Sequence, residues 1–87
     1  MGKRIIDKSK SFDKAIKHLK DKTTKIRLWK KISKIIEDPT IGDFLKNNKK
    51  GVRKICIPPF RLLYRYHKEG DRIELIDFDN RDKIYRK

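Results

Sequence analysis

The sequence predicts an α+β fold in which an N-terminal helical hairpin packs against a small antiparallel β-sheet. Two observations carry this prediction. Apolar side chains recur at helical spacing over residues 12–36, and three β-rich segments separated by turn residues follow over residues 52–79. Because the chain has 87 residues, we expect residues 1–87 to form a single domain.

The first half of the chain predicts a short strand followed by the first helix. The strand covers Lys3 to Asp7, and Ser9 or Ser11 then offers a side chain that can cap a helix. The helix that follows has lysines on its outer face and an apolar stripe formed by Phe12, Ala15, Ile16 and Leu19.

A second amphipathic helix follows a joint at Thr23 and Thr24, where we expect a hydroxyl to cap it. The helix should end near Asp38, because Pro39 cannot continue it and disfavours helical geometry in the residue before it. The expected apolar stripe of this helix consists of Ile26, Trp29, Ile32, Ile35 and Ile36.

Residues 39–50 are polar and predict a loop, which Ile41, Phe44 and Leu45 should attach to the core. Strands are expected at 52–57, 60–67 and 72–79, because these segments are rich in aromatic and branched residues. Residues 80–87 predict one helical turn or a tail.

The charge of the chain points to a polyanionic partner. Lys and Arg number 26 against 12 Asp and Glu, which gives a formal net charge of +14. Such an excess favours binding to phosphates, where basic side chains release counterions. Heat adaptation is the alternative, but it predicts acids that match the bases in number, and here they fall well short.

The single cysteine and the hydropathy pattern bear on location. Cys56 has no second cysteine to pair with and lies in an apolar run, so a reduced thiol in a cytoplasmic protein is expected. No apolar stretch approaches the roughly 20 residues that a membrane-spanning helix needs. We therefore expect no membrane association.

Alternation along the strand at 60–67 separates an apolar face from a basic one. The face expected to cover the helices carries Phe60, Leu62, Tyr64 and Tyr66. The face expected to stay open carries Arg61, Leu63, Arg65 and His67. Guanidinium groups held on a strand can grip phosphate and stabilise charge that develops on it, although a solvated outer face is the plainer interpretation.

The same alternation brings further cations to the open face. Lys54 should point to this side from the preceding strand, and Arg81 and Tyr85 follow just after the last strand. No motif for zinc, a P-loop nucleotide or a dinucleotide is present, and Asp77 and Asp79 are better explained by ion pairing than by a metal. No cofactor and no metal are therefore expected.

A site that cleaves a phosphodiester without metal ligands depends on a nucleophile from the substrate. The 2′-hydroxyl of RNA is such a nucleophile, and the protein then supplies a base, an acid and charge stabilisation. A lysine among arginines suits proton transfer, because like charges lower its pKa. Lys54 is expected on the same face as the arginines.

The order of the elements and motifs resembles the RelE/ParE superfamily of toxins from toxin–antitoxin modules. The resemblance rests on Asp38-Pro39 after the helices, a basic strand, the segment Phe60–Tyr64, and the segment Asn80–Tyr85. It implies a small sheet with a helical hairpin on one side. RelE-like members cleave mRNA on the ribosome by activating the 2′-hydroxyl, without a metal, whereas ParE-like members poison DNA gyrase.

The resemblance also implies roles for individual residues. Lys54 would activate the 2′-hydroxyl, and Arg61 would stabilise the phosphorane oxygens. Arg81 would bind phosphate and aid departure of the leaving group, and Tyr85 would stack on a base or donate a proton. Nucleic-acid contacts are expected from the remaining basic residues of interest, namely Arg53, Arg65, Lys30, Lys31 and Lys34.

Three positions depart from the pattern of the superfamily. Asn80 stands where many members have histidine, Cys56 stands where some have a second catalytic lysine, and Asp79 places an acid near the site. The sequence therefore predicts a ribosome-dependent mRNA endoribonuclease held inactive by an acidic antitoxin protein. A gyrase poison and a catalytically inactive protein with a binding or regulatory role remain as alternatives.

Overall fold

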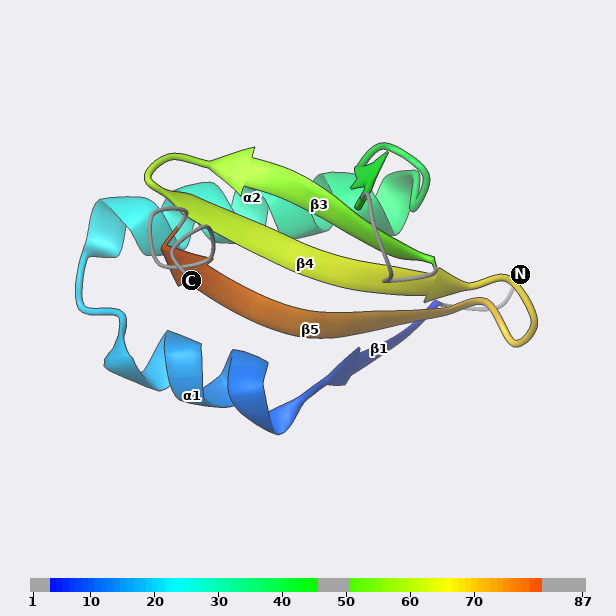
Figure 1. Cartoon of the computed structure of the whole chain (residues 1–87), viewed down its shortest axis with the longest axis horizontal. Helices are drawn as coiled ribbons and strands as arrows, with labels where there is room; N and C mark the ends of the chain where they lie inside the picture. Colours follow the sequence, from blue (N-terminus) through cyan, green and yellow to red (C-terminus); the bar gives the residue numbers. More distant parts are fainter. Residues whose placement is uncertain (1–3, 46–50, 81–87) are drawn as a thin grey trace.

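The computed structural model describes residues 4–45 and 51–80. In this part of the chain, two helices accompany a five-stranded sheet (Figure 1). The elements, in chain order, are β1 (Ile5–Lys8), α1 (Lys10–His18), α2 (Lys22–Glu37), β2 (Asp43–Phe44), β3 (Val52–Ile57), β4 (Phe60–His67) and β5 (Arg72–Asn80).

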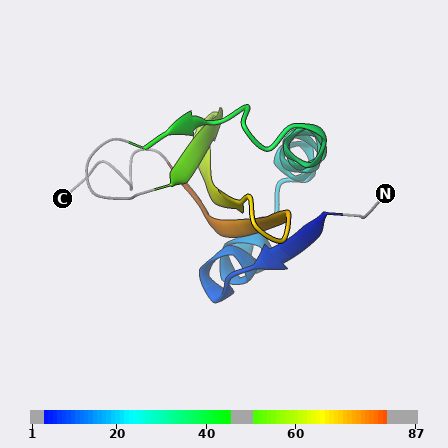
Figure 2. The same ribbon diagram turned by 90° about the vertical axis from the view of Figure 1, so that its right-hand side faces the viewer.

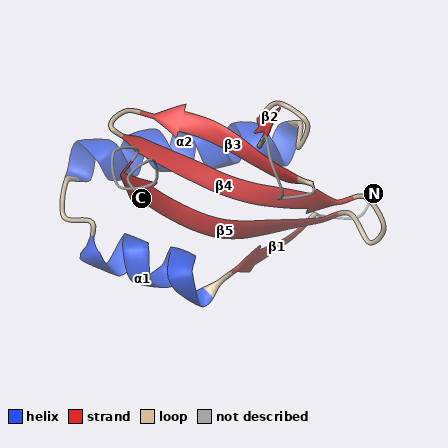
Figure 3. Cartoon of the chain, in the orientation of Figure 1, coloured by secondary structure: helices blue, strands red, loops and turns tan. Residues whose placement is uncertain are grey.

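The strands are arranged in the order β1-β5-β4-β3-β2 (Figure 3). Neighbouring strands from β2 to β5 are antiparallel, which confirms the predicted meander of β3, β4 and β5. β1 joins the sheet beside β5 and runs parallel to it, and this orientation was not anticipated. β2 was missed because it contributes only two residues within a segment of polar composition.

Each helix is preceded by a polar residue whose side chain caps its first turn. Ser9 caps α1, since its hydroxyl accepts a hydrogen bond from the Phe12 amide at 3.0 Å. Asp21 caps α2, because its carboxylate accepts from the Thr23 amide at 3.2 Å and from the Thr24 hydroxyl at 2.6 Å. The predicted cap at the two threonines is therefore wrong, because the cap is Asp21 and both threonines lie inside the helix, whereas the predicted end of the second helix at Asp38 is confirmed.

The helices lie over different parts of the sheet. α2 runs behind β3 and β4, and α1 lies beside β5 (Figures 1 and 2). The two run in opposite directions along the sheet, as expected of a hairpin. The core between these layers contains Phe12, Leu19, Leu28, Ile32, Ile35, Ile57, Leu62, Tyr64, Ile73, Leu75 and Phe78.

The apolar stripe predicted for α2 is partly wrong. Ile32 and Ile35 are buried as expected, but Ile36 is 38% exposed, and Leu28 takes the third core position and is completely buried. Ile26 and Trp29 are 57% and 42% exposed. The stripe that faces the sheet runs through Leu28, Ile32 and Ile35, so Ile26 and Trp29 lie on another side of the helix.

Tyr64 attaches the segment after α2 to the core. Its buried hydroxyl donates a hydrogen bond to the Pro39 carbonyl at 2.8 Å and accepts one from the Gly42 amide at 2.9 Å. A Cβ atom at Gly42 would lie 2.7 Å from this hydroxyl, so the close approach needs glycine. The prediction that Ile41 and Phe44 anchor this segment is wrong, since both are exposed.

Candidate functional site

The pairing of the strands defines a face of the sheet that points away from α2. Directly paired residues share a face, so the register of β3, β4 and β5 assigns each side chain to one side. The register shifts between Leu63 and Tyr64, so that Ile76 is an extra residue in β5 and Asp77 lies on the same face as Glu74. This open face carries Val52, Lys54, Cys56, Arg61, Leu63, Arg65, His67, Arg72, Glu74, Asp77 and Asp79.

Two of the predicted catalytic residues are neighbours on the open face. Lys54 pairs with Leu63 of β4, and Arg61 lies two residues before Leu63 on the same strand. Such diagonal neighbours are about 7–8 Å apart, which long side chains can span. Lys54 is half-buried and pairs on its other side with Asp43 of β2.

Arg61 differs from its prediction, because only 3% of it is exposed. It lies on the central strand, between Cys56 of β3 and Asp79 of β5 in the register. Alternation identifies its face correctly, but that face is covered here. The expectation that this face stays open at Arg61 is therefore wrong.

Arg65 takes part in a charge cluster near the β4–β5 turn. Its guanidinium lies 3.4 Å from a Glu74 carboxylate oxygen, and the same oxygen is 3.0 Å from the His67 Nε2. The hydrogen bond from His67 is the largest cause that lowers the pKa of Glu74, and the charges of Arg65, His67 and Arg72 lower it further. Arg65 thus has an acidic partner on the face where a phosphate partner was predicted.

β5 brings three acids to the open face, and sequence reasoning gave them too little weight. Two of these carboxylates also accept hydrogen bonds from backbone amides of their own strand. Asp77 accepts a hydrogen bond from the Phe78 amide at 2.9 Å, and Asp79 accepts one from the Asn80 amide at 2.7 Å. Glu74, Asp77 and Asp79 share one face only because the register of β5 shifts by one residue between Glu74 and Asp77. This arrangement is known from the strand pairing and cannot be found in the sequence pattern.

Arg53 lies on the opposite face from Lys54. It donates hydrogen bonds to the Gly42 carbonyl at 2.8 Å and to the Thr40 carbonyl at 3.3 Å. Its guanidinium also lies over the Phe44 ring at 3.9 Å from the centroid. These contacts hold the β2 segment, so the structure does not bring Arg53 together with the other predicted site residues.

The three predicted lysines of α2 lie together around a hollow at the edge of β3. This basic hollow is lined by Arg27, Lys30, Lys31, Lys34, Cys56, Ile57 and Pro58. It adjoins the open face through Cys56, which pairs with Arg61. Arg81 and Tyr85 lie outside the described residues.

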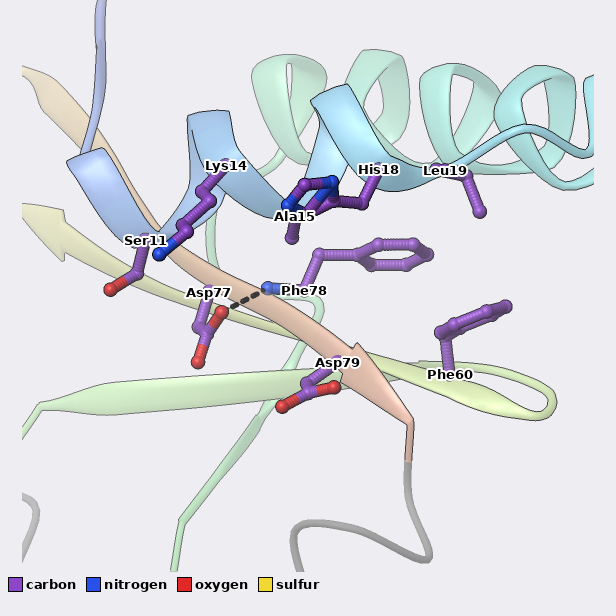
Figure 4. Close-up of a pocket in the computed structure, with 9 residues that line it drawn as sticks. All are labelled: Ser11, Lys14, Ala15, His18, Leu19, Phe60, Asp77, Phe78 and Asp79. Carbon is purple, nitrogen blue, oxygen red and sulfur yellow. Dashed lines mark hydrogen bonds between the residues drawn. The ribbon is translucent and has the colours of Figure 1, made fainter.

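A second hollow lies between α1 and the last part of β5 (Figure 4). Its floor includes Phe60 and Phe78, whose rings stack with centroids 4.9 Å apart. Acidic and basic side chains both reach this mixed hollow, whose lining consists of Ser11, Lys14, Ala15, His18, Leu19, Phe60, Asp77, Phe78 and Asp79. Sequence reasoning did not anticipate it, because its walls come from segments about 60 residues apart.

Two further findings concern metal binding and membrane-spanning helices. Within residues 4–45 and 51–80, no group of three His, Cys, Asp or Glu side chains is arranged to hold a metal ion. In the same ranges, no helix is long and apolar enough to cross a membrane.

Comparison with solved structures shows how widely this architecture recurs. The isolated RelE toxin from E. coli has a TM-score of 0.77 and 22% identity, over 94% of this chain and 90% of that one. A chain of the RelBE2 toxin–antitoxin complex from Mycobacterium tuberculosis has a TM-score of 0.76 and 16% identity, over 92% and 100%. A chain of the E. coli DinJ–YafQ complex has a TM-score of 0.66 and 19% identity, over 95% and 99%.

These likenesses show that the chain has the fold of the RelE toxin. The sequence model described as the ParE toxin of the type II toxin–antitoxin system parDE matches residues 6–85. The chain therefore belongs to the ParE toxin family of type II toxin–antitoxin systems. No curated protein sequence matches the chain significantly.

Proposed function

We propose that this toxin is a RelE-like, ribosome-dependent mRNA endoribonuclease that uses the 2′-hydroxyl of the RNA as its nucleophile. The observation that carries the proposal is the diagonal placement of Lys54 and Arg61 on the open face. A base and a cation at this separation can serve the two ends of one phosphodiester. The likeness to isolated RelE supports a common framework for such a site.

The proposed reaction needs no atom beyond the RNA and the protein. Lys54 in its neutral form removes the proton from the 2′-hydroxyl, and the oxygen attacks the adjacent phosphorus. Arg61 stabilises the negative charge on the phosphorane oxygens. The bond to the 5′-oxygen then breaks, a proton is returned to that oxygen, and a 2′,3′-cyclic phosphate remains. Arg81 and Tyr85 are proposed to aid this departure, as the resemblance implies.

The ribosome, mRNA and an acidic antitoxin are the proposed partners, in the cytoplasm. Two of the similar structures are complexes of a toxin with an antitoxin, which supports an antitoxin partner here. A net charge of +14 favours both ribosomal RNA and an acidic protein as ligands. Binding of the antitoxin over the basic surfaces would compete with RNA for the same charges.

Poisoning of DNA gyrase is the second candidate function. It is favoured by one specific observation, the match of the ParE toxin sequence model across residues 6–85. In that case the basic surfaces would contact gyrase or its DNA, and no phosphodiester would be cut by the toxin itself.

One experiment with two parallel assays separates these functions. The purified toxin is added to a reconstituted translation reaction, and primer extension maps cuts in the transcript. The same preparation is incubated with gyrase and supercoiled plasmid, and trapped DNA breaks are scored. We expect cuts within the ribosomal A site and intact plasmid. Broken plasmid with uncut transcript would replace the first proposal by the second, and inactivity of folded toxin in both assays would favour the regulatory alternative.

A further inference from the structure

The basic hollow lies where the outer edge of β3 loses its neighbouring strand. In the described part of the chain, β2 pairs with β3 only at Arg53 and Lys54. Beyond this point the edge of β3 faces α2, and Cys56 and Ile57 form one wall of the hollow. The edge therefore opens toward the helix instead of being closed by another strand.

All charged side chains that line the hollow are cationic. Arg27, Lys30, Lys31 and Lys34 follow the spacing i, i+3, i+4 and i+7, so they share one face of α2. None of them takes part in the ion pairs found among the described residues. The charge of Arg27 also helps to lower the pKa of Asp21, whereas the three lysines are left available to a partner.

The hollow has a fixed wall and an apolar patch. Arg27 donates a hydrogen bond to the Pro58 carbonyl at 3.0 Å, which ties α2 to the turn between β3 and β4. Pro58 is exposed and adds apolar surface beside the four cations, whereas Ile57 is buried beneath it. Positively charged grooves that follow the backbone are a common means of binding single-stranded nucleic acids.

The hollow continues onto the open face. Cys56 lines the hollow and pairs directly with Arg61 across one strand spacing, which is about 4.8 Å. A chain that leaves the hollow over Cys56 therefore runs above Arg61, whose own side chain is only 3% exposed, toward the half-buried Lys54 as the diagonal neighbour. No other strand separates the two sites.

We propose that the basic hollow binds the phosphate backbone of the single-stranded RNA substrate and leads this strand over Cys56 onto the open face. The inference rests on the proposed endoribonuclease function and assigns the lysines of α2 to the substrate strand. Arg27 acts as a positioning residue, because it holds the β3–β4 turn while it lines the hollow. The strand then meets Lys54 and Arg61 from the side of β3.

Cys56 provides a reporter within the proposed path, because it is exposed and is the single cysteine of the chain. The rate of its alkylation by iodoacetamide is measured with and without an eight-nucleotide 2′-O-methyl RNA, which has no free 2′-hydroxyl to react. Affinity for the same oligonucleotide is measured by fluorescence anisotropy at two salt concentrations. We expect RNA to slow alkylation at least fivefold at low salt, and expect affinity to fall steeply with salt.

Two double variants with the same change in charge test the path. In K30E/K34E the reversed charges lie in the hollow, whereas in K17E/K22E they lie on exposed positions outside it. We expect K30E/K34E to lose at least tenfold in RNA affinity and to lose the protection of Cys56. K17E/K22E should retain the protection and should lose affinity only slightly. Thermal melts verify that both variants are folded.

Three outcomes would overturn the inference. The first is equal loss of protection in the two variants, and the second is an unprotected thiol in wild-type toxin that binds the RNA. The third is tighter binding to duplex DNA of the same length than to the RNA. None of these readouts requires cleavage, so a failure of the path is distinguishable from a failure of the proposed reaction, which appears as uncut transcript.

Discussion

The two strands that flank β4 bring opposite charges to the open face. β3 contributes Lys54, and its free edge borders the basic hollow. β5 contributes three acids, and its free edge borders the mixed hollow (Figure 4). The charges are therefore unevenly distributed. The four cations of the basic hollow lie toward β3 and α2, whereas β5 carries three acids together with Arg72, which is ion-paired with Asp7.

This uneven distribution has a consequence for orientation. A polyanion is attracted to the β3 half of the face and repelled by Glu74, Asp77 and Asp79 in the β5 half. Like charges directly opposite one another destabilise a sheet, so the acids of β5 also allow cations to gather on β4 before any partner binds. The same acids that limit the binding surface thus support the fold.

The largest expected effect compares a single residue from each half. Lys54→Ala should reduce transcript cleavage on the order of 10²-fold or more, the usual scale for loss of a general base. Asp77→Ala should change cleavage by less than about fivefold, because it removes neither the base nor a cation. Single-turnover primer extension on programmed ribosomes measures both rates.

Thermal melts are the control for this comparison, since Lys54 is half-buried and its replacement should leave the protein folded. Equal losses of cleavage in the two variants would remove the functional distinction between the halves. A loss confined to Asp77→Ala would transfer the chemistry to the β5 side.

Arg61 lies at the boundary between the two halves and sharpens the comparison. Because it is 3% exposed, Arg61→Ala should lower the free energy of unfolding by about 1–3 kcal/mol, the cost of disturbing buried polar contacts. Cleavage per folded molecule should also fall about 10²-fold. Chemical denaturation and single-turnover kinetics on the folded fraction separate the two effects.

Arg61→Lys is the matched variant, because it keeps the charge and loses the planar fork. Arg61→Lys should have a higher free energy of unfolding than Arg61→Ala, but its cleavage rate per folded molecule should stay almost as low. Full cleavage per folded molecule in Arg61→Ala would show that this residue is structural, and the proposed site would then depend on Lys54 without it.

Much of the fold could be predicted from sequence because local patterns determine it. Alternation placed β3, β4 and β5, and Pro39 ended α2 at Asp38. The stripe of α2 was only half right, since Ile26 and Leu28 are both apolar and periodicity alone does not choose between them. β1 pairs with residues far along the chain, so no local signal specified its parallel orientation.

The candidate site was less predictable than the fold. Alternation identified the faces of Lys54 and Arg61, but exposure depends on what neighbouring strands and segments cover, and this misled the prediction for Arg61. The acids of β5 share the open face because of a one-residue register shift opposite Leu63 and Tyr64, and the sequence pattern does not reveal this shift. Arg53 is a residue type that often binds phosphate, but in the structure it contacts the β2 segment. These tertiary contacts could not be predicted from the sequence.

The smallest expected effect concerns Glu74, which partners Arg65 and His67 in the β5 half. Its pKa is lowered in the folded protein, chiefly by the hydrogen bond from His67. A carboxyl with a lowered folded pKa stabilises the protein above its unfolded pKa, and this contribution is lost as pH falls through the folded value. Glu74→Gln should therefore lower the unfolding free energy by less than about 1 kcal/mol near pH 7, since the pair is partly solvated.

The difference between wild type and Glu74→Gln should shrink as the pH falls below the ordinary glutamate range, where the wild-type carboxyl also becomes neutral. Denaturant titrations between pH 7 and pH 3 measure it. Glu69→Gln is the control, because Glu69 is exposed in the β4–β5 turn and should show no such trend. If the Glu74 difference instead grew toward acid, its charge would be unfavourable in the folded state. The acids of β5 would then weaken the sheet, and only the β3 half of the comparison would keep its physical basis.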